Sequence, residues 1–119
     1  MTAVSKDPFL YISHIFDAIT SIEKQVQGIT REQFDDSELL QGFVERKLEI
    51  IGEATKNISD IFKKQHSVIP WKDMAGMRDV LIHQYTAVDE DIVWKTVTEK
   101  VLPLKKQLKH ILDLYEKKE

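Results

Sequence analysis

The stretch from Asp7 to Gly28 reads DPFLYISHIFDAITSIEKQVQG, and it decides the fold class of this chain. Asp before Pro is a typical helix start, because the Asp side chain caps a free backbone N–H and Pro suits the first helical position. The apolar residues that follow recur at steps of three and four, which places them on one helical face: Phe9, Ile12, Ile15, Phe16, Ile19, Ile22 and Val26. Gly28 is suited to end such a helix. The stretch therefore predicts a long amphipathic helix.

The next signals along the chain predict a short helical turn and a second long helix. Thr30 to Gln33 has the spacing of a capping box, which favours a short helical turn. Asp36 or Ser37 then caps a helix whose apolar stripe continues to about His66–Ser67. Gly52 lies within that stripe, and its small size would let another helix approach closely.

Two further helices complete the predicted fold. Pro70 begins a third helix, and Val88–Asp89 supplies the N-cap of a fourth. Pro103 lies inside the apolar pattern of the fourth helix, so a kink or short break is expected near it. Because the loops between these helices are short, the sequence predicts an all-α, antiparallel four-helix bundle that forms a single domain over residues 1–119.

Composition restricts the class of protein. Hydrophobic residues make up 42% of the 119 residues and charged residues 31%, values typical of a soluble globular domain. The chain has no Cys, and no apolar run approaches the roughly 20 residues that a membrane span requires. The first residues lack the apolar segment of a secretory signal, so we expect a soluble cytoplasmic protein. The net charge of −3 disfavours a broad basic face, so any nucleic-acid role would depend on a small local site.

The segment Arg78-Asp79-Val80-Leu81-Ile82-His83-Gln84-Tyr85 carries the richest chemistry of the chain. Arg offers a permanently charged fork that suits phosphate oxygens, His moves protons near neutral pH, and Tyr offers a hydroxyl. The sequence contains no Gly-rich phosphate loop and no His, Asp or Glu cluster at metal-ligand spacing. We therefore expect a site for a phosphate-containing substrate at Arg78, His83 and Tyr85, without metal or cofactor.

The geometry of an ideal helix leaves two arrangements open for this segment. Arg78 and Tyr85 lie within about 20° of one another around the helix, whereas Arg78 and His83 are about 140° apart. Either the helix ends near His83 and turns it inward, or two copies of the chain place their Arg and His residues in one shared cleft. The second arrangement predicts a homodimer.

Other polar residues have simpler interpretations. Glu53 follows Gly52 on the packing side of the second helix, where it either orients Arg78 or Arg46 or is an exposed helical Glu. The remaining histidines are scattered singly and are interpreted as surface or cap residues: His14, His66 and His110.

Several segments occur together in an order that resembles a known family. Residues 44–54 read VERKLEIIGEA, residues 69–85 read IPWKDMAGMRDVLIHQY, and Val88–Asp89, Ile92–Trp94 and Leu102–Leu104 follow at matching gaps. Together they resemble the HepT-like branch of the HEPN superfamily. The resemblance covers nearly the whole chain and implies a HEPN-like helical bundle.

The resemblance also implies a function. HepT-like proteins are metal-independent endoribonucleases that act as homodimers and serve as toxins of prokaryotic toxin–antitoxin pairs, and their partner is a minimal nucleotidyltransferase antitoxin. Their motif of Arg, four residues, His, any residue and Tyr is matched here by Arg78, His83 and Tyr85. The partner silences such toxins by attaching adenylate to the motif Tyr, here Tyr85. The residue after the Arg is commonly Asn in this branch, whereas this chain has Asp79.

A mechanism without a metal follows for these residue types. His83 would take the proton of an RNA 2′-hydroxyl, and Arg78 would stabilise the charge that develops on the attacked phosphate. Asp79 lies four residues before His83 and would hold its imidazole and raise its pKa. The substrate would be an RNA loop, such as part of a tRNA. The acidic overall charge suits recognition of such a loop better than binding of long unstructured RNA.

Two other functions are compatible with the same residues. The first is a non-catalytic helical partner or substrate of a nucleotidyltransferase, which Asp79 and the acidic surface favour. The second is a nucleotide-binding module in which Arg78 and Tyr85 hold a phosphate and a base.

Overall fold

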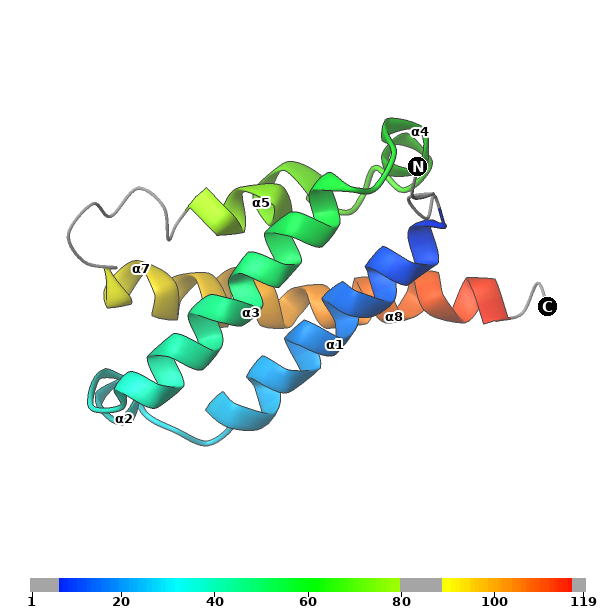
Figure 1. The fold of residues 1–119 in the computed structure, drawn as a ribbon. Helices are drawn as coiled ribbons and strands as arrows, with labels where there is room; N and C mark the ends of the chain where they lie inside the picture. Colours follow the sequence, from blue (N-terminus) through cyan, green and yellow to red (C-terminus); the bar gives the residue numbers. More distant parts are fainter. Residues whose placement is uncertain (1–6, 80–88, 117–119) are drawn as a thin grey trace, which may run out of the picture.

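The computed structural model describes residues 7–79 and 89–116, and this part of the chain is an all-α bundle (Figure 1). Two long helices, α1 (Pro8–Val26) and α3 (Glu38–Lys56), pack against each other and run in opposite directions. The predicted all-α fold is confirmed.

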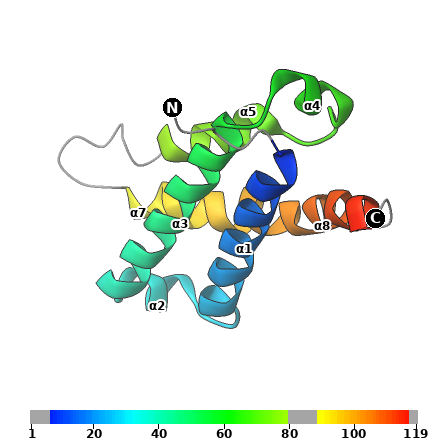
Figure 2. The same cartoon turned by 45° about the vertical axis from the view of Figure 1, so that its right-hand side comes forward.

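The fourth predicted helix is a long rod that crosses behind α1 and α3 in two different views (Figures 1 and 2). It consists of α7 (Glu90–Lys95), the π-helical segment η2 (Thr96–Val101) and α8 (Leu102–Glu116). Because Pro103 has no N–H and its ring crowds the carbonyl four residues earlier, a regular α-helix is disfavoured just before it. The interruption expected near Pro103 is therefore present, and it takes the form of a wider π turn.

The helix starts follow the capping signals of the sequence. The Asp7 carboxylate accepts a hydrogen bond from the Phe9 backbone N–H at 2.9 Å. Thr30 and Gln33 form the complete capping box that begins α2 (Arg31–Asp35). Ser37, one of the two caps considered, accepts from the Leu40 N–H at the start of α3. The Asp89 side chain caps α7 in the same way.

The second predicted helix is shorter than expected. It does not continue to His66–Ser67, because α3 ends at Lys56 and α4 (Asp60–Gln65) begins after a break. Ser59 begins α4 by accepting a hydrogen bond from the Phe62 N–H at 3.2 Å. Ile58 within the break and Phe62 just after it are both buried, so the apolar stripe continues across the break and conceals it in the sequence.

The third predicted helix is α5 (Trp71–Ala75), and the 3₁₀ turn η1 (Gly76–Arg78) extends it. Trp71 anchors its start, because the indole N–H donates to the carbonyls of Lys63 and His66 at 3.1 and 3.0 Å. Both α5 and η1 pack against α3. This packing determines where Arg78 lies.

The core lies between α1, α3 and the rod, and its largest fully buried side chains come from every layer: Ile12, Ile15, Ile19, Ile22, Phe34, Val44, Leu48, Ile51, Met74, Met77, Val93 and Leu108. Phe34 stacks at 5.1 Å on Trp94, which joins α2 to α7. Arg31 crosses the same junction with an ion pair of 2.7 Å to Asp91.

Candidate active site

Arg78 is positioned by a glycine on the neighbouring helix. A Cβ atom at Gly52 would lie only 2.9 Å from the Arg78 Cβ, 3.1 Å from the Arg78 backbone nitrogen and 3.3 Å from the Ala75 carbonyl oxygen. Those separations are shorter than van der Waals contact, so η1 can rest on α3 at this distance only because residue 52 has no side chain. The close approach expected at Gly52 is confirmed, and the element that approaches is the one that carries Arg78.

Glu53, the next residue of α3, holds the side chain of Arg78. The Arg78 Nη1 lies 2.6 Å from the Glu53 Oε1. The two side chains are 41% and 54% exposed, so this pair contributes at most about 1 kcal/mol to folding. Its consequence is orientation, because it fixes the direction of a guanidinium that water also reaches. Of the two arginines considered for Glu53, Arg46 instead pairs with Glu49 at 3.1 Å.

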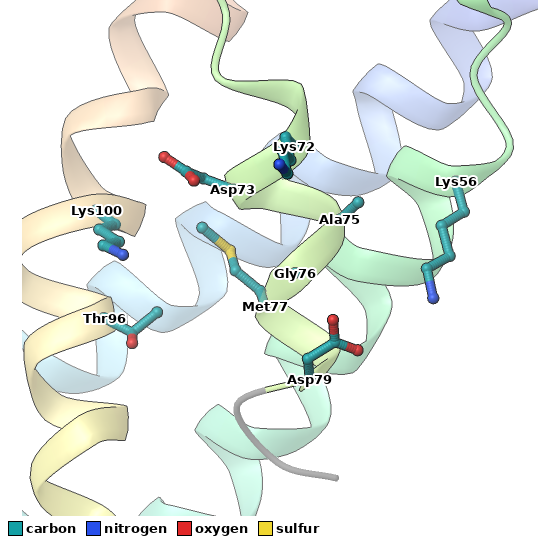
Figure 3. Close-up of a pocket in the computed structure, with 9 residues that line it drawn as sticks. All are labelled: Lys56, Lys72, Asp73, Ala75, Gly76, Met77, Asp79, Thr96 and Lys100. Atoms are coloured by element: carbon teal, nitrogen blue, oxygen red, sulfur yellow. The ribbon is translucent and has the colours of Figure 1, made fainter. Parts of the chain in front are cut away.

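Asp79 directly follows Arg78 and lines a cavity of about 430 Å³ between α5, η1 and η2 (Figure 3). Lys56, Lys72 and Lys100 line the same cavity. No pattern in the sequence indicates this grouping, because the three lysines are far apart along the chain and only the tertiary fold brings them together.

His83 and Tyr85, the other two residues of the predicted site, lie outside the described residues. The described chain stops at Asp79 on one side of them and resumes at Asp89 on the other. Their participation in the site therefore remains a prediction from the sequence.

The first turn of α7, just after that interval, contains an unusual carboxyl group. Burial is the main cause that raises the pKa of Glu90 to about 7, and the neighbouring Glu45 carboxylate on α3 contributes to the same rise. The Glu90 Oε2 is buried and has no hydrogen-bond partner among the described residues. Sequence reasoning missed this pair, because a Glu in the first turn of a helix is ordinarily a solvated residue that favours the helix dipole.

A second cavity, of about 240 Å³, lies beside Glu53 between α1 and α3. Tyr11, His14 and Arg46 are among the residues that line it. His14 is exposed, as is His110, and both agree with the expected surface positions. His66 caps the end of α4 and packs on the Phe62 ring at 4.6 Å, which agrees with a cap residue.

Over residues 7–79 and 89–116, no group of three or more His, Cys, Asp or Glu side chains could hold a metal ion. No helix in these ranges has both the length and the apolar character that crossing a bilayer requires.

Comparison with known proteins places this chain in a family. A family model described as ribonuclease HepT-like matches residues 15–111, a range that includes Arg78 and the segment up to Tyr85. No solved structure matches the chain significantly.

Curated relatives agree with that match. A protein of Caldanaerobacter subterraneus subsp. tengcongensis, provisionally named as an RNase, is 45% identical over 108 residues, which are 90% of this chain and 96% of the relative. A probable ribonuclease HepT of Thermococcus cleftensis is 48% identical over 80% of this chain and 86% of its own length. A Methanocaldococcus jannaschii protein named as a gamma-glutamylcyclotransferase and provisional RNase is 38% identical over 94% of this chain, which spans 50% of that longer protein. This chain therefore belongs to the ribonuclease HepT-like family of the HEPN superfamily.

Proposed function

We propose that this chain is a metal-independent endoribonuclease that cleaves RNA at a site built on Arg78 and His83. The observation that carries the proposal is the fixed guanidinium of Arg78, which Gly52 places against α3 and Glu53 orients at 2.6 Å. A preorganised positive charge is what a phosphoryl-transfer transition state requires. Membership of the ribonuclease HepT-like family supports the same assignment.

The proposed reaction uses the nucleophile that RNA itself carries. The His83 imidazole takes the proton of the 2′-hydroxyl, the 2′ oxygen attacks the adjacent phosphorus, and the bond from phosphorus to the 5′ oxygen breaks. The departing 5′ oxygen takes a proton from water, and the products are a 2′,3′-cyclic phosphate and a 5′-hydroxyl end. Arg78 stabilises the extra negative charge on the phosphate oxygens, and Asp79 holds the imidazole of His83.

The Arg78–Glu53 pair has a defined role in this scheme. Both side chains remain partly exposed, so a substrate phosphate can reach the guanidinium without breaking a buried interaction. Glu53 acts as a positioning residue that keeps the Arg78 fork turned toward the surface of α3 until the phosphate binds.

The proposed regulation acts on Tyr85. A minimal nucleotidyltransferase antitoxin transfers AMP from ATP to the Tyr85 hydroxyl, and pyrophosphate leaves. The attached nucleotide adds bulk and a negative phosphate two residues from His83, which blocks the cleft and neutralises Arg78. The chain is then the toxin of a toxin–antitoxin pair, acts as a homodimer in the cytoplasm and has an RNA loop, such as one of a tRNA, as its substrate.

The deciding experiment is induced expression of the chain with and without its neighbouring nucleotidyltransferase, followed by sequencing of RNA that ends in a cyclic phosphate. We expect growth arrest and discrete new ends, both abolished by Arg78→Ala or His83→Ala and both suppressed by the partner. Arg46→Ala is the matched control, because that arginine is exposed and pairs with Glu49 instead. Unchanged RNA from soluble wild-type protein would overturn the proposal.

A non-catalytic partner of the nucleotidyltransferase is the second candidate, and Asp79 is the observation that favours it. A carboxylate next to Arg78 repels the phosphate that the arginine must bind. The same experiment separates the two functions, because a partner-only protein would bind the nucleotidyltransferase tightly while its expression left growth and RNA unchanged. Asp79→Asn would then be the first variant to assay for cleavage.

A further inference from the structure

The cavity beside Asp79 differs in charge from the rest of the chain. Its three lysines face two aspartates, Asp73 and Asp79, which leaves one net positive charge in a chain whose total is −3. None of the three lysines forms an ion pair with a described residue, although seven ion pairs occur elsewhere in those residues. Cations that have no ion-pair partner among the described residues and gather in one cavity are available to an anion.

The lysines reach the cavity from three separate elements. Lys56 is the last residue of α3, Lys72 belongs to α5, and Lys100 belongs to η2. Figure 3 shows Lys56 and Lys100 on opposite sides of the turn that carries Gly76 and Met77. A nucleic-acid strand that crossed this turn, which lies next to Arg78 in the sequence, would have Lys56 on one side and Lys100 on the other.

Lys100 belongs to the π-helical segment of the rod and lines the cavity from it. Val93, Val97 and Val101, each four residues after the last, are buried in this part of the rod, and Thr96 is buried beside them. Four residues make slightly more than one turn of an α-helix and slightly less than one turn of a π-helix, so these valines stay on one face of the rod. Thr96 and Lys100 are also four residues apart, and they form the adjacent row that lines the cavity. Turns of this kind often occur at functional sites.

We propose that this cavity binds a phosphodiester of the RNA strand next to the one that is cleaved, with Lys56 and Lys100 as its principal contacts. The proposal rests on the proposed function, since it adds a second phosphate subsite to the same substrate. One phosphodiester carries one negative charge, which matches the net positive charge of the cavity. Asp79 opposes this binding, because its carboxylate lies in the same cavity.

Binding of RNA over a salt series tests the proposal without relying on catalysis. The probe is a short RNA hairpin with a single-stranded loop, titrated by fluorescence anisotropy with the full chain carrying His83→Ala. We expect Lys56→Gln and Lys100→Gln each to lower the affinity by up to about fivefold, the range of an exposed ion pair. Each should also lower the slope of log affinity against log salt by about 0.7, because one fewer counterion contact is made to a single strand. Asp79→Asn should raise the affinity.

Lys24→Gln is the matched control, because it removes the same charge from an exposed lysine on α1, which does not line the cavity. A control that lowered the affinity and the salt slope as much as Lys56→Gln would overturn the proposal in favour of diffuse attraction. Unchanged RNA binding by both Lys56→Gln and Lys100→Gln would also overturn it. If these two variants kept RNA binding but lost binding to the nucleotidyltransferase, the cavity would instead be a contact for that protein. All three lysines are exposed, so the variants should keep the wild-type unfolding temperature.

The outcomes for the two proposals are separable. If His83→Ala leaves RNA cleavage unchanged, the proposed chemistry fails while the affinity and salt slope still report on the cavity. If cleavage depends on His83 but the cavity variants bind RNA normally, the endoribonuclease stands and the phosphate subsite fails.

Discussion

Gly52 is the residue on which the position of Arg78 most directly depends. We predict that Gly52→Ala destabilises the protein by about 1–2 kcal/mol, because the forced contact costs roughly 1–3 kcal/mol and exceeds the gain of up to about 1 kcal/mol in helix propensity. The added methyl group would push η1 away from α3, since it meets Arg78 at 2.9 Å. RNA cleavage should therefore fall by more than the loss of folded protein explains. Chemical denaturation and a cleavage assay at matched folded concentration measure the two effects.

Gly42 provides the control for that prediction within the same helix. A Cβ at Gly42 meets nothing within 4 Å, so Gly42→Ala should stabilise α3 by up to about 1 kcal/mol and leave cleavage unchanged. If Gly52→Ala matched Gly42→Ala in both stability and cleavage, the glycine would have no role in placing Arg78.

At the scale of elements, the start of α7 should respond to pH through Glu90. Its folded pKa is about 7 against an ordinary value of 4.5, so between these values the folded state keeps a proton that the unfolded chain has lost. Stability should therefore fall as pH rises from about 4.5 to about 7 and level off above. Glu45 on α3, Asp35 on α2 and Asp89 at the α7 cap are the carboxylates that contribute to this shift.

Glu90→Gln tests that behaviour, because an uncharged amide resembles the protonated acid. We predict that the stability of the variant no longer falls between pH 4.5 and pH 7. At pH 8 the variant should be more stable than wild type by about 1–2 kcal/mol, which is less than the whole pKa shift would give because the carboxyl groups are coupled. Thermal unfolding over a pH series measures it. The exposed Glu99 supplies a control in Glu99→Gln, which should keep the wild-type slope. Parallel pH profiles for Glu90→Gln and wild type would contradict the assignment.

The elements also differ in how well the sequence predicted them. Helices with a side-chain cap and a clear stripe, such as α1 and α3, begin where their signals indicate, because capping is a local interaction within a few residues. The break between α3 and α4 was missed, since Ile58 and Phe62 keep the helical period across it while only Ser59 marks the new start. The π turn was anticipated as an irregularity near Pro103, but its form depends on packing against the core, which no local pattern contains.

For the whole molecule, the parts of the candidate site also differ in whether a local sequence pattern or only the tertiary fold reveals them. Arg78 and Asp79 are predicted as site residues because they lie with His83 in one short segment of the sequence. The range that the family model matches includes this segment. The Glu53 partner was one of several interpretations until the fold paired it with Arg78. The cavity lysines were not predicted at all, because residues 56, 72 and 100 come together only when α3, α5 and η2 pack.

The arrangement of two chains gives the last prediction. On an ideal helix Arg78 and His83 are about 140° apart, which favours a site that takes its Arg from one protomer and its His from the other. Mixing Arg78→Ala protein with His83→Ala protein should then restore cleavage, although each alone is inactive. Random exchange of protomers makes half of the dimers mixed. A two-fold dimer has two sites, and each mixed dimer has one of them intact, so about a quarter of the wild-type activity should return. The control mixes Arg78→Ala protein with a variant that carries both Arg78→Ala and His83→Ala. This mixture contains no intact Arg78 and should stay inactive. A mixture that remains inactive after exchange, verified by mass spectrometry of the dimers, would assign both residues of a site to one chain and require the helix to end near His83.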